Sequence, residues 1–218
     1  MAKAHKGAIW VLAGTNGAGK TSILGAEISE RNLDFLNPDE AARSIRTADP
    51  SLSQQEANSR AWHENVDLLQ RTILEKTSYA FETTLGGNTI PALLKKATDS
   101  GLDVNIAYVG LRDPELHIAR VKARVARGGH DIPEEKIRER YANSVVNLIG
   151  LMPALTELLI YDNSEEADPH SGKEPRPLLI LHFRRGKFLR CCDAAEVPEW
   201  AKPIVITAVD LEQQAGRR

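Results

Sequence analysis

Gly14-Thr-Asn-Gly-Ala-Gly-Lys-Thr21 matches the pattern G-x-x-x-x-G-K-[ST] at every fixed position. The apolar run 8–13 precedes this stretch, and apolar residues at helical spacing follow it from Ser22 onward. A strand that leads into a glycine-rich loop lets successive backbone N–H groups surround a phosphate, and the following helix adds the positive end of its dipole. The sequence therefore predicts a binding site for a nucleoside triphosphate.

The individual residues of this loop have expected contacts. Lys20 is expected to reach the β- and γ-phosphates, and the Thr21 hydroxyl is expected to ligate Mg²⁺. ATP and Mg²⁺ are therefore the predicted cofactors. The predicted nucleotide-binding residues are Gly14, Thr15, Asn16, Gly17, Ala18, Gly19, Lys20, Thr21 and Ser22.

Composition excludes several classes of protein. A chain of 218 residues is long enough to bury the core of one α/β domain. The net charge of −2 argues against a nucleic-acid-binding protein, because such proteins carry a strongly basic face. No stretch approaches the roughly eighteen apolar residues of a membrane span. The adjacent residues Cys191 and Cys192 favour a reducing compartment, since a disulfide between neighbours is strained. We predict a cytoplasmic protein without nucleic-acid or membrane partners.

Apolar segments that alternate with helical patterns indicate a parallel sheet. The predicted core strands are 8–13, 33–36, 79–84, 104–109 and 158–162, and the segments 178–183 and 188–192 form a β-hairpin at the edge. Asn37 is predicted to cap a helix that starts at Pro38, and Ser53 with Glu56 forms a capping box. We therefore predict an α/β fold with a mostly parallel five-stranded core sheet, helices on both faces and a C-terminal β-hairpin.

We interpret residues 1–218 as a single domain with three special regions. Residues 110–150 form a lid or substrate region, 163–177 a mobile loop, and 178–192 the hairpin appendage. The helical pattern from Pro133 is expected to continue to about Leu159, with a restart at Pro153. The tail from Ile204 is apolar enough to dock, whereas residues 211–218 are expected to fray.

Polar residues follow the predicted strands, where the ligand crevice of a parallel sheet lies. They are Asp39, Glu82 with Thr84, Arg112 and Asp162. Carboxylates near a nucleotide phosphate suit a kinase, in which one accepts the proton of an acceptor hydroxyl and others hold Mg²⁺-bound water or the acceptor. Asp39 is the predicted base, although a first-turn acidic residue also stabilises a helix dipole. Glu82 is predicted to bind substrate because a buried strand end rarely keeps a carboxylate without a partner.

Three arginines form one stripe of a predicted helix. Arg120, Arg124 and Arg127 follow at i, i+4 and i+7, directly before the possible hinge Gly128-Gly129. An arginine on a mobile lid stabilises the charge of phosphoryl transfer, and Arg120 and Arg127 are the preferred catalytic candidates. The alternative interpretation is a solvated basic stripe.

Read together, these motifs resemble the zeta-toxin family of P-loop kinases. The resemblance includes the phosphate loop, Asn37-Pro-Asp39, Phe81-Glu-Thr-Thr84 and Arg127-Gly-Gly-His-Asp-Ile-Pro133, and it extends through Tyr161-Asp-Asn-Ser164. It implies phosphorylation of UDP-N-acetylglucosamine or a related UDP-sugar. Lys20 and Thr21 would hold MgATP, Asp39 would be the base, Glu82 and Thr84 would bind the sugar, and Arg120 and Arg127 would contact phosphates.

The chain departs from the best-known toxins of that family at one position. Those toxins carry an arginine where this chain has Gly86, so a wider or less anion-selective sugar site is expected here. An antitoxin partner is possible by resemblance. Two other functions remain open: a nucleoside or antibiotic kinase on the same fold, and an ATPase or nucleotide-gated interaction module in which Asp162 would hold Mg²⁺.

Overall fold

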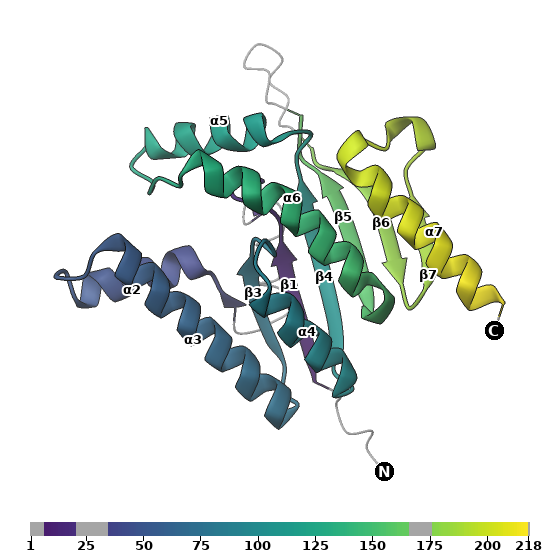
Figure 1. The fold of residues 1–218 in the computed structure, drawn as a ribbon, viewed down its shortest axis with the longest axis horizontal. Coiled ribbons are helices and arrows are strands. Elements are labelled where there is room, and N and C mark those ends of the chain that lie inside the picture. The colour runs from purple at the N-terminus through teal and green to yellow at the C-terminus, as the bar shows by residue number, and fades with distance from the viewer. Residues whose placement is uncertain (1–6, 21–34, 166–175, 218) are drawn as a thin grey trace.

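The computed structural model describes residues 7–20, 35–165 and 176–217. In these residues the strands form one sheet in the order β2-β3-β1-β4-β5-β6-β7 (Figure 1). Strands β2, β3, β1, β4 and β5 pair in parallel, whereas β6 and β7 are antiparallel. The strands are β1 (Ala8–Ala13), β2 (Phe35–Leu36), β3 (Tyr79–Thr83), β4 (Asp103–Gly110), β5 (Glu157–Asp162), β6 (Leu178–Arg184) and β7 (Lys187–Cys191). The predicted parallel core and edge hairpin are confirmed, and the hairpin continues the same sheet.

Helices connect these strands, as the alternating sequence pattern predicts. They are α2 (Pro38–Ala48), α3 (Gln54–Glu75), α4 (Thr89–Asp99), α5 (Pro114–Val125), α6 (Glu134–Leu151) and α7 (Lys202–Gly216), with short 3₁₀ turns at Met152–Ala154, Ala194–Glu196 and Glu199–Ala201. The helix expected from Ser22 and the start of the second strand at Leu33 lie outside the described residues. Within the described ranges, no helix is long and apolar enough to cross a bilayer.

The main hydrophobic core lies between one face of the sheet and helices α3, α4, α6 and α7. Ile9 and Val11 of β1 contribute to this core, and Leu12 points to a smaller cluster on the opposite face. Alternation along a strand places these neighbours on opposite sides. Figure 1 shows α4 and α6 crossing this face, with α2 and α3 at one end of the sheet and α7 at the other.

Both predicted helix caps are confirmed. The Asn37 side chain accepts a hydrogen bond from the Asp39 backbone N–H at 2.9 Å, and Pro38 occupies the first helical position. Ser53 and Glu56 form the reciprocal capping box of α3. The Asn37 cap fixes the start of α2 and thereby the position of Asp39.

Two predicted boundaries were wrong. Helix α6 ends at Leu151 instead of continuing toward Leu159, because the 3₁₀ turn that contains Pro153 interrupts it. After this turn the Thr156 backbone N–H donates a hydrogen bond to the Val104 carbonyl of β4 at 2.8 Å. The tail is helical through Gly216 where fraying was expected. Glu212 accepts a hydrogen bond from the Phe188 backbone N–H of β7, which attaches this part of α7 to the sheet.

Candidate active site

The glycine-rich loop has the backbone conformation of a phosphate cradle. Gly14 and Gly17 have φ angles of +138° and +85°, in the region that disfavours side chains. A Cβ atom at Gly14 would overlap the Val109 carbonyl oxygen, and one at Gly17 would lie 2.6 Å from the His117 carbonyl oxygen. The described part of the loop therefore requires glycine at these two positions, and phosphate binding by the loop stays a prediction from the motif. The predicted Mg²⁺ ligand Thr21 and its neighbour Ser22 lie outside the described residues.

Lys20 is buried in this loop and held by two oxygens. Its side chain is 6% exposed, and Nζ donates to the Gly14 carbonyl at 2.8 Å. The same ammonium lies 3.2 Å from Oε1 of Glu82, whose side chain is 15% exposed. Asn37 Nδ2 is 3.5 Å from the other oxygen of Glu82. The ends of β2 and β3 are thereby joined to the phosphate loop, as the crevice rule for parallel sheets predicts.

Three side chains from distant parts of the chain support the loop. His117 Nδ1 donates to the Asn16 carbonyl at 2.8 Å, and Arg140 Nη1 donates to Oδ1 of the same asparagine at 2.8 Å. Asn163 Nδ2 donates to the Ala18 carbonyl at 2.9 Å. Sequence reasoning missed all three roles. Burial lowers the pKa of His117 to about 4, so the imidazole is neutral at pH 7 and Nδ1 carries the proton that it donates.

Asp39 lies at the first turn of α2 and faces the lid region. Its Oδ2 atom is 3.4 Å from Nη1 of Arg124, and its Oδ1 atom is 3.9 Å from Nε2 of His130. Its side chain is 41% exposed. The carboxylate is therefore accessible to a bound molecule, while the Arg124 guanidinium and the His130 ring from the α5–α6 segment lie beside it.

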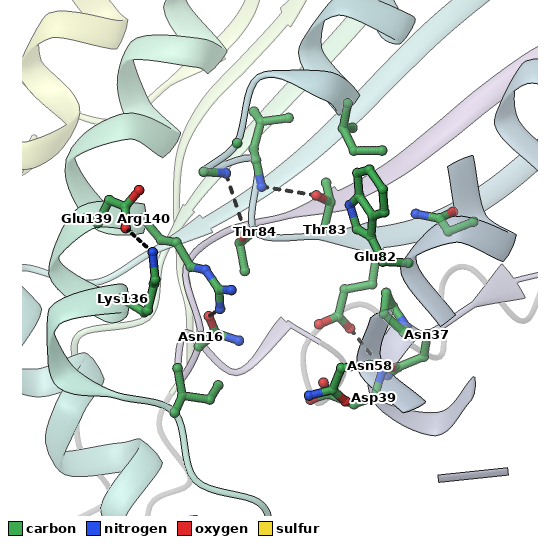
Figure 2. Close-up of a pocket in the computed structure, with 18 of the residues that line it drawn as sticks. Asn16, Asn37, Asp39, Asn58, Glu82, Thr83, Thr84, Lys136, Glu139 and Arg140 are labelled. Carbon is green, nitrogen blue, oxygen red and sulfur yellow. Dashed lines mark hydrogen bonds and ion pairs between the residues drawn. The ribbon is translucent and has the colours of Figure 1, made fainter. Parts of the chain in front are cut away.

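One cavity of about 510 Å³ lies at the carboxyl ends of the strands, and its wall includes Asn16, Asn37, Asp39, Glu82, His130 and Arg140. Figure 2 shows Asn16 and Arg140 on one side of this main cavity and Glu82, Asn37 and Asp39 on the other. The volume falls in the range of small-molecule sites. The wall is rich in neutral hydrogen-bonding side chains, which are Asn16, Asn37, Asn58, Asn65, Thr83, Thr84 and Thr89.

The arginines of the predicted stripe have different environments. Arg124 contacts Asp39, although Arg120 and Arg127 were the preferred candidates. Arg120 Nη2 donates to the Glu165 carbonyl at 3.2 Å, and Arg127 is exposed. Arg140 was not predicted, because its contact with the loop joins residues 124 positions apart. In the sequence, Arg140 is visible only as one arginine of the helical pattern that follows Pro133.

Two other residues near strand ends, Asp162 and Arg112, do not line the main cavity. Asp162 Oδ1 accepts hydrogen bonds from Ser164 Oγ at 2.7 Å and from the Trp200 indole N–H at 2.9 Å. Arg112 donates from its backbone N–H to Ser164 Oγ at 2.7 Å. Asp162 thus has a structural role in the described chain. Among the described residues, no three His, Cys, Asp or Glu side chains form a metal-binding group.

Gly86 lies against helix α6, and the expected difference in width or anion selectivity of the sugar site stays a prediction. A Cβ atom on this glycine would be 2.9 Å from both Cα and Cβ of Arg140. The helix therefore occupies the space that a side chain at position 86 would need, and Arg140 itself lines the main cavity. The glycine permits a close approach that brings another arginine into the site.

The zeta toxin family model matches residues 2–174. This chain belongs to the zeta toxin family. A Haemophilus influenzae protein described as uncharacterized is 32% identical over 128 residues, which make up 59% of this chain and 88% of that protein. The predicted family resemblance is therefore confirmed.

Solved structures with low sequence identity share the fold. The AvrRxo1-ORF1:-ORF2 structure with ATP has a TM-score of 0.65 at 14% identity, and the match covers 93% of this chain but only 64% of that chain. The PezAT toxin–antitoxin system of Streptococcus pneumoniae has a TM-score of 0.56 at 15% identity, covering 97% of this chain and 88% of that chain. The P-loop kinase fold is thus confirmed.

Proposed function

We propose that this zeta toxin family member is a kinase that transfers the γ-phosphate of ATP to a hydroxyl group of a small molecule. A UDP-sugar similar to UDP-N-acetylglucosamine is the first acceptor to test. The observation that carries the proposal is that Asp39, Glu82 and the phosphate-loop residue Asn16 line the same cavity. A carboxylate and a phosphate cradle on one cavity are what transfer to an alcohol requires.

In the proposed reaction, Asp39 accepts the proton of the acceptor hydroxyl. The hydroxyl oxygen forms a bond to the γ-phosphorus, the bond from that phosphorus to the β–γ bridging oxygen breaks, and ADP leaves. Lys20 and the loop N–H groups hold the phosphates, and Arg140 adds positive charge from α6. Mg²⁺ would neutralise phosphate charge, with Thr21 as its ligand according to the motif. Arg120 and Arg127 remain proposed phosphate contacts of the lid.

The walls of the main cavity support a sugar-containing acceptor. Neutral amide and hydroxyl groups form hydrogen bonds with a polyhydroxylated ligand without the desolvation cost of a charge. Trp62 also lines the cavity and is 42% exposed, so a broad apolar ring surface is available to a sugar or base. Thr84 and Glu82 are proposed acceptor contacts on the same wall.

The ATPase-module alternative has less support from the contacts. It requires Asp162 to hold Mg²⁺, but Oδ1 of Asp162 already accepts hydrogen bonds from Ser164 and Trp200. Asp39, by contrast, is accessible in the cavity. An antitoxin partner remains a separate proposal, suggested by the family and by the toxin–antitoxin system that shares the fold.

The test is mass-resolved phosphate transfer from ATP to UDP-N-acetylglucosamine, to nucleosides and aminoglycosides, and to a metabolite extract. We expect Asp39→Asn to lower kcat by about 10²- to 10⁴-fold, as loss of a general base does, with ATP affinity retained. Lys20→Ala should weaken ATP binding. Glu40→Gln is the matched control, because Glu40 is the exposed neighbour of Asp39. Full-rate transfer by Asp39→Asn, or ATP hydrolysis without any acceptor, would contradict the proposal.

A further inference from the structure

Three polar side chains on one side of α6 contact three different parts of the molecule around the candidate site. Arg140, Ser144 and Asn147 follow at i, i+4 and i+7, the spacing that places side chains in one row along a helix. Arg140 contacts the phosphate loop, Ser144 contacts β4, and Asn147 contacts the segment that joins β3 to α4. One helix therefore reaches both the nucleotide side and the acceptor side of the main cavity.

The two outer contacts of this row support loops of the site. Arg140 Nη1 donates to Asn16 Oδ1 of the phosphate loop at 2.8 Å (Figure 2). Asn147 Nδ2 donates to the Leu85 carbonyl at 2.8 Å and to the Gly87 carbonyl at 3.1 Å. Leu85 has a φ angle of +56°, which side chains other than glycine rarely adopt, so this loop needs support from outside. The positions of both loops therefore depend on where α6 lies.

Between these contacts, a buried pair of hydroxyl groups attaches α6 to the sheet. The Tyr108 hydroxyl of β4 lies 2.9 Å from Ser144 Oγ, and the two residues are 2% and 0% exposed. Burial raises the pKa of Tyr108 to about 12, and the hydroxyls of Ser144 and Thr15 oppose part of that rise, so the phenol keeps its proton at neutral pH. A buried hydrogen bond has a preferred length and direction, so it restricts sliding and rotation of the helix more than apolar contacts do.

We propose that Tyr108 and Ser144 are positioning residues whose hydrogen bond holds α6 where Arg140 can support the phosphate loop. The inference rests on the proposed kinase function, in which Arg140 adds positive charge at the phosphates. Arg140 is one helical turn from Ser144, so a displacement of α6 at the hydroxyl pair also displaces the guanidinium group. Among the described residues that line the main cavity, neither Tyr108 nor Ser144 occurs, so their effect on a ligand must pass through the helix.

Calorimetric titration with ADP and Mg²⁺ tests this role in the full-length protein. We expect Tyr108→Phe and Ser144→Ala each to weaken ADP binding by about threefold to tenfold. In an Arg140→Gln background the same changes should have less than about a 1.5-fold further effect, because Arg140 carries the effect. Tyr79→Phe is the matched control, since it removes another buried tyrosine hydroxyl, which donates to Asn65 of α3. Any effect of Tyr79→Phe should be equal in both backgrounds. Unchanged ADP affinity in Tyr108→Phe, or effects that add to those of Arg140→Gln, would overturn the inference.

The Tyr108→Phe/Ser144→Ala double variant separates positioning from stability. Each single variant leaves one buried hydroxyl without its partner, whereas the double variant removes both groups, so its free energy of unfolding in urea should return toward the wild-type value. ADP binding should stay at least about threefold weaker, because the bond that fixes the helix is still absent. Recovery of wild-type ADP affinity in the double variant would show that the pair only stabilises the fold and would contradict the proposal.

Phosphate transfer provides an independent readout. With an acceptor that the wild type uses, Tyr108→Phe should lower kcat at least about threefold, and the same change should have no further effect on kcat in the Arg140→Gln background. A loss of kcat that is equally large in both backgrounds would contradict a role through Arg140. If the wild type transfers phosphate to no acceptor, the proposed kinase function is wrong, and the ADP titrations still decide whether the hydroxyl pair positions α6.

Discussion

The ammonium group of Lys20 lies 3.2 Å from the carboxylate of Glu82, and both side chains are largely withdrawn from solvent. The motif assigns this lysine to the β- and γ-phosphates. A nucleotide that enters the loop must therefore compete with Glu82 for the lysine. Glu82 also lines the acceptor cavity, so the same carboxylate links the nucleotide side of the site to the acceptor side.

Glu82→Gln should separate these two effects. Removing the negative charge relieves the competition, so we expect ATP binding without Mg²⁺ to strengthen by about threefold to tenfold, equivalent to roughly 0.7–1.4 kcal/mol. Phosphate transfer should fall because the acceptor loses a charged partner. Calorimetric ATP titration and initial-rate assays measure the two quantities. Weaker ATP binding by the variant would show that Glu82 positions Lys20 rather than competing for it.

The close contact between Gly86 and α6 predicts different effects for two adjacent substitutions. Gly86→Ala places a methyl group within 3 Å of Arg140 backbone and side-chain atoms and should destabilise the fold by about 1–3 kcal/mol. Gly87→Ala is the matched control, since a Cβ there meets no atom within 4 Å. Urea unfolding compares the variants. Equal stability of the two would mean that α6 moves away at little cost, and the transfer rate would then report whether Arg140 moved with it.

His117 gives stability a defined pH dependence. Its folded pKa is about 4 and its ordinary value is 6.5, because burial disfavours the charged ring. Above pH 6.5 both states are neutral at this residue, so it contributes no pH dependence. Between 6.5 and 4 only the unfolded chain binds the proton, so stability falls as pH is lowered, by about 2 kcal/mol at pH 5.

The His117→Asn variant isolates this contribution. Asparagine retains an N–H donor for the Asn16 carbonyl but has no titrating group in this range. We expect the difference in unfolding free energy between pH 7 and pH 5 to be smaller in the variant by roughly the same 2 kcal/mol. Urea unfolding at both pH values provides the measurement. Identical pH dependence in the two proteins would contradict a neutral, buried His117.

Trp200 is predicted to act on the nucleotide loop from the C-terminal segment. Its indole N–H donates to Asp162, and the next residue, Asn163, holds the Ala18 carbonyl. Trp200→Phe retains a ring but loses the donor, so we expect a loss of about 1–3 kcal/mol in stability and several-fold weaker ATP binding, with the acceptor KM unchanged. Trp62 lies in the acceptor cavity, so Trp62→Phe should raise the KM for the acceptor and leave ATP binding unchanged. If Trp200→Phe destabilises the protein without changing its affinity for ATP, Trp200 only packs against the sheet and does not act on the nucleotide loop.

Local patterns predicted the parts of the fold that local interactions determine. The caps at Asn37 and Ser53 depend on residues within three positions, and the strand before the phosphate loop on a continuous apolar run. The end of α6 was misplaced because Leu158 and Leu159 continue an apolar pattern that suits a helix or a buried strand equally. Pairing with β4, a tertiary interaction, decides between them.

The sequence predicted the site residues that lie at the ends of strands, but it did not predict the residues that contact the phosphate loop from distant parts of the chain. Asp39 follows β2 and Glu82 lies at the carboxyl end of β3, so the crevice rule placed them on the same cavity. Contacts of the phosphate loop with His117, Arg140 and Asn163 join residues more than one hundred positions apart. The contacts of His117 and Arg140 depend on how α5 and α6 pack against the sheet, and that of Asn163 depends on the position of β5; periodicity gives no information on either.

The hydrogen bond between Trp200 and Asp162 has a consequence for protein engineering. The family match ends at residue 174, yet the Trp200 ring covers Gly110 so closely that a methyl group on this glycine would overlap it. Truncation at residue 174 would remove β6, β7 and α7 and leave β5 as an uncovered sheet edge. An expression fragment should therefore extend to the end of α7. The same segment must be transferred intact in any chimera with another family member.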